Sequence, residues 1–292
     1  MKRKFKLLLI LVLVLCAGCE SNIGINKDAM EDIKIYTSLY PIQYVTENLY
    51  KGKADIENMY PAGINPYEYK FTKKQLDNYS MSDLVIYNGL TTEKDLIVEM
   101  INKNKELKII DATAKITYTY DIDEIWINPS NVIMMAKNVK DGIGEYTNSE
   151  YLKKDIEHNF NDLNIELSKL DANIKEDIEN AKYKTIITTT DNLKTLEKYG
   201  LTIYSLDEKS VTDKTYNDVV KLIKDKQIGY IYTTSHTKNN KFLNNLVNAF
   251  PSLEQVEINT LNNISDSDKK NNNDYITIMN ENLDKLKKEL YK

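Results

Sequence analysis

The 292-residue sequence contains only two cysteines and two histidines, and this scarcity restricts its chemistry. Both cysteines, Cys16 and Cys19, lie near the N-terminus, so the rest of the chain has no disulfide and no thiol for catalysis or zinc binding. The two histidines, His158 and His236, are expected to be surface residues. Zinc prefers nitrogen and sulfur ligands, and the sequence offers few of either.

Other absences exclude broad functional classes. The net charge is −5, and it is spread along the chain without blocks of one sign. No basic patch with interleaved aromatic residues is present, so we expect no nucleic-acid partner. No Ser/His/Asp set, phosphate-binding loop or HExxH word is present either, so we expect a protein that is not an enzyme.

The N-terminus has the pattern of a bacterial export signal. A basic segment at residues 2–6 precedes an unbroken apolar run at residues 7–15. This run is too short for a membrane span, which needs about 20 residues. Two small residues directly before Cys19 resemble a lipobox, although Cys16 stands where Leu is usual. We therefore expect residues 1–18 to be a lipoprotein signal peptide and Cys19 to be the lipid attachment site; an ordinary cleaved secretory signal is the alternative.

The chain beyond the signal predicts an α/β fold with two lobes. Residues 19–32 are polar and lack periodicity, as in a flexible tether. Residues 33–128 and 182–292 each alternate short apolar runs with helical stretches, which favours a mostly parallel sheet with flanking helices in each lobe. Residues 129–181 have helical periodicity and predict linker helices. One of them is a long rigid interdomain helix of about 30 residues, or roughly 45 Å.

The apolar runs give the positions of the expected strands, and the ends of these strands give the expected position of a ligand. A ligand of such a fold binds in the cleft outside the carboxyl ends of the strands. Residues 265–273 are polar and are expected to form a surface loop. The expected strands are residues 34–39, 54–60, 83–88, 108–111, 185–189, 201–206, 228–233 and 255–258.

One motif carries the strongest functional signal. Residues 60–69 read Tyr-Pro-Ala-Gly-Ile-Asn-Pro-Tyr-Glu-Tyr. The order Pro-x-Gly-x-x-Pro-His-x-Tyr closes one strand in the zinc- and manganese-type substrate-binding lipoproteins of bacterial ABC importers, and here the frame is intact with Tyr67 in the histidine slot. From about residue 33 to its end, the chain resembles this family. The other matching words are residues 38–41, 87–90, 126–129, 199–201 and 275–283.

The resemblance implies a monomeric receptor on the extracytoplasmic face of the cell membrane that serves an ABC permease. In the family, four side chains at strand ends hold one divalent metal ion, Mn or Zn, between the lobes. Tyr40 and Trp126 are expected to line the same cleft. The family's four ligand positions correspond here to Tyr67, Glu124, Thr189 or Thr190, and Asn263.

These four side chains make an unusual ligand set. The phenol of Tyr67 is a poor metal ligand while it keeps its proton, whose reference pKa is about 10. Glu124 is the single expected charge; Thr190 suits a helix cap and Asn263 a turn. An all-oxygen set suits harder ions such as Mn, Mg or Ca, so we expect weak zinc binding. Three hypotheses stay open: a metal receptor, a receptor re-purposed for a small polar organic ligand or metal chelate, and a surface or adhesion protein without a transport role.

Overall fold

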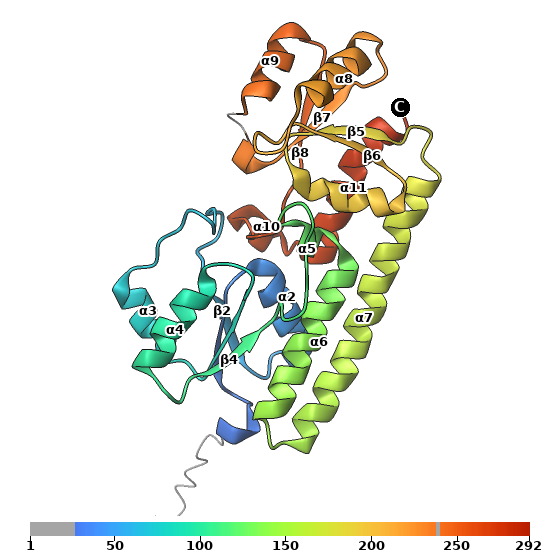
Figure 1. Ribbon diagram of the computed structural model, residues 1–292. Helices are drawn as coiled ribbons and strands as arrows, with labels where there is room; N and C mark the ends of the chain where they lie inside the picture. Colours follow the sequence, from blue (N-terminus) through green and yellow to red (C-terminus); the bar gives the residue numbers. More distant parts are fainter. Residues whose placement is uncertain (1–26, 238–239) are drawn as a thin grey trace, which may run out of the picture.

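The computed structural model describes residues 27–237 and 240–292. It consists of two α/β lobes joined by a long helix, which confirms the predicted fold class (Figure 1). The predicted signal peptide and the lipid attachment site Cys19 lie outside the described residues. Within the described residues, no helix is both long enough and apolar enough to span a bilayer.

The N-terminal lobe is built on a four-stranded parallel sheet. The strands lie in the order β2-β1-β3-β4. The second strand therefore pairs with one side of the first, and the third and fourth strands follow on its other side. The strands are β1 (Lys34–Thr37), β2 (Asp55–Asn58), β3 (Leu84–Tyr87) and β4 (Lys108–Asp111), and the helices are α2 (Tyr40–Tyr50), α3 (Lys73–Ser80) and α4 (Glu93–Lys103).

The C-terminal lobe repeats this plan. Its parallel sheet has the order β6-β5-β7-β8, which is the same path from the central strand outward. Its strands are β5 (Thr185–Thr188), β6 (Thr202–Ser205), β7 (Tyr230–Thr233) and β8 (Glu254–Glu257). Its helices are the 3-10 helices η2 (Asp191–Tyr199) and η3 (Ser235–Thr237), and α8 (Asp213–Lys224), α9 (Lys241–Ala249), α10 (Asp266–Asn271) and α11 (Tyr275–Leu290).

Three helices connect the lobes: α5 (Glu124–Ile127), α6 (Pro129–Tyr146) and α7 (Glu150–Glu179). The 30 residues of α7 span roughly 45 Å and run alongside α6 before reaching the C-terminal lobe (Figure 1). The Ser149 hydroxyl caps α7 by accepting a hydrogen bond from the Leu152 N–H at 3.1 Å. Apolar residues at three- and four-residue steps form the buried stripe of the helix, namely Leu152, Ile156, Leu163, Leu167, Leu170, Ile174 and Ile178.

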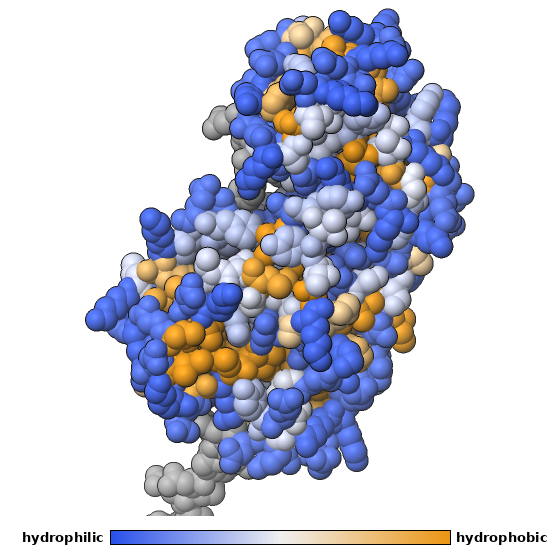
Figure 2. Space-filling view, in the orientation of Figure 1, coloured by the Kyte–Doolittle hydropathy of each residue, from blue (hydrophilic) through white to orange (hydrophobic). Residues whose placement is uncertain are grey.

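The hydrophobic core runs through both lobes and the linker. One cluster of buried side chains extends from β1 and α2 through α6 and α7 to β5 and α11. Two smaller clusters cover the opposite faces of the two sheets. Sheets buried on both faces are typical of parallel α/β folds. The face seen in Figure 2 is mainly hydrophilic, and a broad apolar area lies on the N-terminal lobe.

Apart from small shifts at the strand ends, the structure differs from the predicted boundaries at two places. Residues 27–32 were expected to be tether, but Lys27–Ala29 form a 3-10 helix, η1, and Met30 is completely buried in the core. Thr147 holds this segment by donating a hydrogen bond to the Ala29 carbonyl at 2.6 Å. Residues 265–273 were expected to be loop, but most of them form α10, because Ser265 caps the helix.

Candidate ligand-binding cleft

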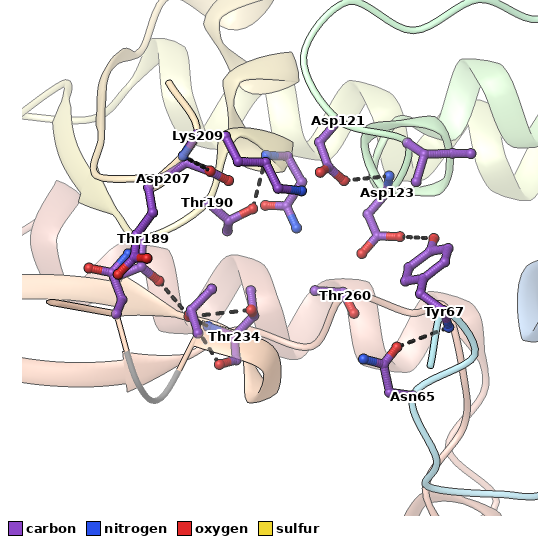
Figure 3. A pocket seen from close by; sticks show the side chains of 15 residues that line it. Asn65, Tyr67, Asp121, Asp123, Thr189, Thr190, Asp207, Lys209, Thr234 and Thr260 are labelled. Carbon is purple, nitrogen blue, oxygen red and sulfur yellow. Dashed lines mark hydrogen bonds between the residues drawn. The ribbon is translucent and has the colours of Figure 1, made fainter. Parts of the chain in front are cut away.

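A cleft of about 650 Å³ lies between the two lobes, near the carboxyl ends of their strands (Figure 3). Side chains from both lobes line it, as expected for a ligand site in this class of fold. The N-terminal side supplies Asn65, Tyr67, Asp121 and Asp123. The C-terminal side supplies mainly hydroxyls, amides and the charged residues of one loop, namely Thr189, Thr190, Asn192, Asp207, Glu208, Lys209, Thr234, Thr237 and Asn240, and Thr260 lies where the chain crosses between lobes.

Tyr67 lies in the cleft and forms a hydrogen-bonded pair with Asp123. The Tyr67 hydroxyl donates to Asp123 Oδ1, and the Asn262 amide donates to Asp123 Oδ2 at 3.3 Å. Burial raises the pKa of Asp123 to about 7, and burial next to that carboxyl raises the pKa of the Tyr67 phenol well above its ordinary value. Although 45% of Tyr67 is exposed, its hydroxyl is engaged, so the phenol is a neutral donor at physiological pH.

Glu124 does not line the cleft, which corrects the sequence-based prediction. Its carboxylate accepts hydrogen bonds from the backbone N–H groups of Thr119 at 2.6 Å and of Tyr120 at 2.8 Å, and a longer one from Asp121 at 3.3 Å. Glu124 is only 6% exposed. It therefore holds the loop before α5 in place, and the preceding residue, Asp123, is the carboxylate that faces the ligand space.

Asn263 also lies outside the cleft. Its amide donates to the carbonyl oxygens of Pro61 at 2.8 Å and Ile64 at 2.9 Å. These bonds fasten the Pro-Gly loop of the N-terminal lobe to the segment before α10. The neighbouring Thr260 lines the cleft in its place.

Tyr40 and Trp126 are core residues and do not line the cleft, contrary to expectation. Tyr40 is 5% exposed and Trp126 is completely buried. The Trp126 carbonyl accepts a 2.7 Å hydrogen bond from the hydroxyl of the buried Tyr275, so this residue joins the linker to α11.

The structure brings both alternative threonines of the C-terminal lobe to the cleft. The Thr189 hydroxyl lies 2.6 Å from the Thr237 hydroxyl. The Thr190 hydroxyl accepts from the Asn192 N–H at 3.3 Å and so caps η2. Neither threonine carries a charge, so this wall meets a ligand with neutral hydroxyl groups.

Several lining residues were missed from the sequence, among them Asp121, Asp207 and Lys209 in loops and Asn192 in η2. Burial raises the pKa of Asp121, and the charge of Asp207 raises it further, while the Asp123 N–H and Lys209 act in the opposite direction. Asp207 follows β6 by two residues, and a search for polar residues just after strands would have found it. Asp121 precedes α5 and has no such signal.

Within the described part of the chain, no group of three or more His, Cys, Asp or Glu side chains is arranged to hold a metal ion. His158 lies on α7, and 76% of its side chain is exposed. Its Nε2 atom is 3.7 Å from Asp162 Oδ2. No cleft residue is close to it in the sequence. The side chain of His236 is not among those that the structure describes. The described cleft offers carboxylate, hydroxyl and amide groups and one lysine ammonium.

The chain matches the family model described as zinc-uptake complex component A, periplasmic, over residues 35–289. Among curated proteins it is 27% identical to the manganese ABC transporter substrate-binding lipoprotein PsaA of Streptococcus anginosus, over 67% of this chain and 68% of that protein. It is 22% identical to the zinc-binding lipoprotein AdcA of Streptococcus pneumoniae, over 90% of this chain but only 56% of that protein.

Solved structures have the same fold. The Zn(II)-bound ZnuA-like domain of Streptococcus pneumoniae AdcA superposes with a TM-score of 0.72 at 21% identity, covering 89% of this chain and all of that one. The periplasmic zinc-binding protein TroA of Treponema pallidum gives a TM-score of 0.70 at 16% identity. At these identities the likeness shows the two-lobed architecture.

Proposed function

Because the chain belongs to the zinc-uptake complex component A family of substrate-binding proteins of metal ABC importers, we propose that it captures a small solute outside the cytoplasm and passes it to an ABC permease. The observation that carries this proposal is the cleft itself. The carboxyl ends of two parallel sheets face one space of about 650 Å³, and α7 holds the lobes around it. Ligand pockets typically measure about 300–1,000 Å³.

In this proposal the protein is a monomer tethered to the outer face of the cell membrane through Cys19. Two acyl chains at that cysteine anchor a protein stably, whereas one chain gives marginal binding. A Cys19→Ala variant is expected to leave the membrane fraction and appear in the medium or periplasm. Immunoblotting of fractionated cells measures this, and unchanged membrane partitioning would refute the lipid anchor.

The cargo of this chain is not a tightly held bare zinc ion. Tyr67 keeps its proton because its phenol is paired with Asp123, and Glu124 is committed to three backbone N–H groups. None of the remaining described cleft groups is an imidazole or a thiolate, the ligands that zinc prefers. A harder divalent ion, a metal chelate or a small polar organic solute fits this wall better.

A thermal-shift screen tests whether the cleft binds cargo, since a ligand that binds the folded state raises the unfolding temperature. The probes are divalent metal salts, metal chelates and small polar metabolites, applied to the full chain. A hit should be weakened by Tyr67→Ala and Thr189→Val, which alter opposite walls. Tyr151→Ala, at a residue of α7 that is 67% exposed, is the matched control. Hits unaffected by both cleft variants would place the site elsewhere, and no hit in any class would favour a surface role without transport.

A further inference from the structure

One short segment of the C-terminal lobe is hydrogen-bonded to the N-terminal wall of the cleft. Residues 259–265 follow β8 and precede α10, and we call them the interlobe strap. The strap begins in the C-terminal lobe, where the Asn282 side chain on α11 accepts a hydrogen bond from the Asn259 N–H at 3.0 Å and donates one to the Asn259 carbonyl at 2.7 Å. Its first residue is therefore fixed to a helix of that lobe.

The other end of the strap is fastened to the Pro-Gly turn of the N-terminal lobe. The Asn263 amide donates to the carbonyl oxygens of Pro61 at 2.8 Å and Ile64 at 2.9 Å. The Ile264 carbonyl accepts from the Gly63 N–H at 3.0 Å. Gly63 has a φ of +72°, a backbone conformation that favours glycine. Three hydrogen bonds thus hold the turn formed by residues 61–64.

This turn leads directly to the cleft residue Tyr67. Asn65 Oδ1 accepts from the Tyr67 N–H at 3.1 Å, and both side chains line the cleft, as does Thr260 of the strap (Figure 3). The Tyr67 hydroxyl is bonded to Asp123, and the other carboxylate oxygen of Asp123 accepts from the Asn262 amide at 3.3 Å. The strap therefore supports the Tyr67–Asp123 pair twice, once through the turn and once through Asp123.

The backbone of the strap adopts an uncommon conformation between these contacts. Leu261 has a φ of +64° and is completely buried. A leucine rarely adopts this conformation, because its Cβ then crowds the backbone. Such residues persist where the surrounding structure holds them, and they are concentrated at functional sites. In the strap this backbone turn combines a buried Leu261 with hydrogen bonds from the Asn262 and Asn263 amides to the N-terminal lobe.

We propose that Asn262 and Asn263 are positioning residues for cargo binding. Through Asp123 and the Pro-Gly turn, they hold the Tyr67 wall in the place that the cargo requires. Asn263 stands at the family's fourth ligand position, yet its amide serves the site from outside the cleft. This inference rests on the proposed function, because it explains how the receptor keeps one wall of its binding site in place.

Two measurements on the full chain test the proposal. Hydrogen–deuterium exchange, followed by mass spectrometry without any ligand, reports local opening of residues 60–69. Calorimetric titration with manganese chloride reports binding. Asn263→Ala should speed exchange in residues 60–69 about tenfold and weaken manganese binding about tenfold, because the turn loses two hydrogen bonds. Asn262→Ala should weaken binding with a smaller change in exchange, because its bond is to Asp123.

Asn271→Ala, at an exposed position in α10, is the matched control and should change neither quantity. Circular dichroism reports folding, and Asn262→Ala decides the test if Asn263→Ala fails to fold. A tie that only stabilised the fold would leave manganese affinity unchanged, because a protein several kcal/mol stable stays folded after losing one or two hydrogen bonds.

The outcomes separate this inference from the function on which it rests. Unchanged exchange in Asn263→Ala, or faster exchange with unchanged manganese affinity, would overturn the positioning role while the receptor function stands. If manganese does not bind the wild-type chain, a manganese cargo is wrong. The exchange measurement then still decides whether the strap holds the Tyr67 wall.

Discussion

The two walls of the cleft differ in how their polar groups are satisfied. On the N-terminal side, Asp123 is bonded to Tyr67 and Asn262, and Glu124 to three backbone N–H groups. On the C-terminal side, Asn192 Oδ1 is buried without a hydrogen-bond partner among the described residues, and Asp207 accepts from the Lys209 N–H. The same strand order underlies both lobes, so topology does not cause this difference. We infer that internal hydrogen bonds hold the N-terminal wall more firmly than the C-terminal wall.

The largest effect is expected from removing the anchor of the N-terminal wall. A Glu124→Ala variant leaves three N–H groups without their acceptor and should lower the free energy of unfolding by about 4 kcal/mol. Urea denaturation measures this. Glu145→Ala, at an exposed position on α6, should change stability by no more than about 0.5 kcal/mol. A loss below about 1 kcal/mol at Glu124 would show that the loop does not depend on this carboxylate.

A second test uses pH to probe the internal bonding of the same lobe. Glu93 is 6% exposed and accepts from the Asn88 N–H at 3.0 Å and the Tyr60 hydroxyl at 3.1 Å. Burial raises its pKa to about 7, against 4.5 in the unfolded chain. Its protonated form therefore stabilises the fold fully below pH 4.5, and this contribution is lost as pH rises through about 7.

The expected size of that loss is on the order of 3 kcal/mol. Glu93→Gln, which cannot ionise, should flatten the fall in the free energy of unfolding between acidic and neutral pH. Glu106→Gln, at an exposed position before β4, should leave the pH profile unchanged. Denaturation at a series of pH values decides between them, and parallel profiles for wild type and Glu93→Gln would argue against a buried, protonated Glu93.

The smallest stability effect is expected at a helix-capping threonine on the C-terminal wall. This test distinguishes a residue that only caps a helix from one that also contacts cargo. Thr190 caps η2 within the cleft, whereas Thr212 caps α8 away from it by accepting from Thr215 N–H at 3.1 Å. Replacing either threonine with alanine should lower stability by about 1 kcal/mol. Only Thr190→Ala should also weaken cargo binding, as measured by calorimetry. Equal affinities for the two variants would remove Thr190 from the binding wall.

The fold was largely predictable from the sequence because apolar runs and helical periodicity mark the elements of a parallel α/β structure. All the expected strands are present; β4 has the expected bounds, and the others differ by one or two residues at their ends. Residues 265–273 were misjudged because they lack apolar residues, although Ser265 followed by Asp268 is a capping signal for α10.

The site was harder to predict because family positions were counted along the chain. Glu124 and Asp123 are adjacent acidic residues at the start of a helical turn, and neighbouring helical side chains point about 100° apart. Sequence spacing cannot decide which of the two faces the cleft. The bond partners decide it: Glu124 turns toward the backbone of residues 119–121, and Asp123 toward Tyr67.

Native mass spectrometry of the full chain, extracted from its own membrane without chelator, tests the central claim most directly. If the interlobe cleft captures a solute, the spectrum should contain a one-to-one adduct that is lost in Tyr67→Ala and kept in the exposed control Tyr151→Ala. A stoichiometric zinc adduct that persists in Tyr67→Ala would contradict the claim.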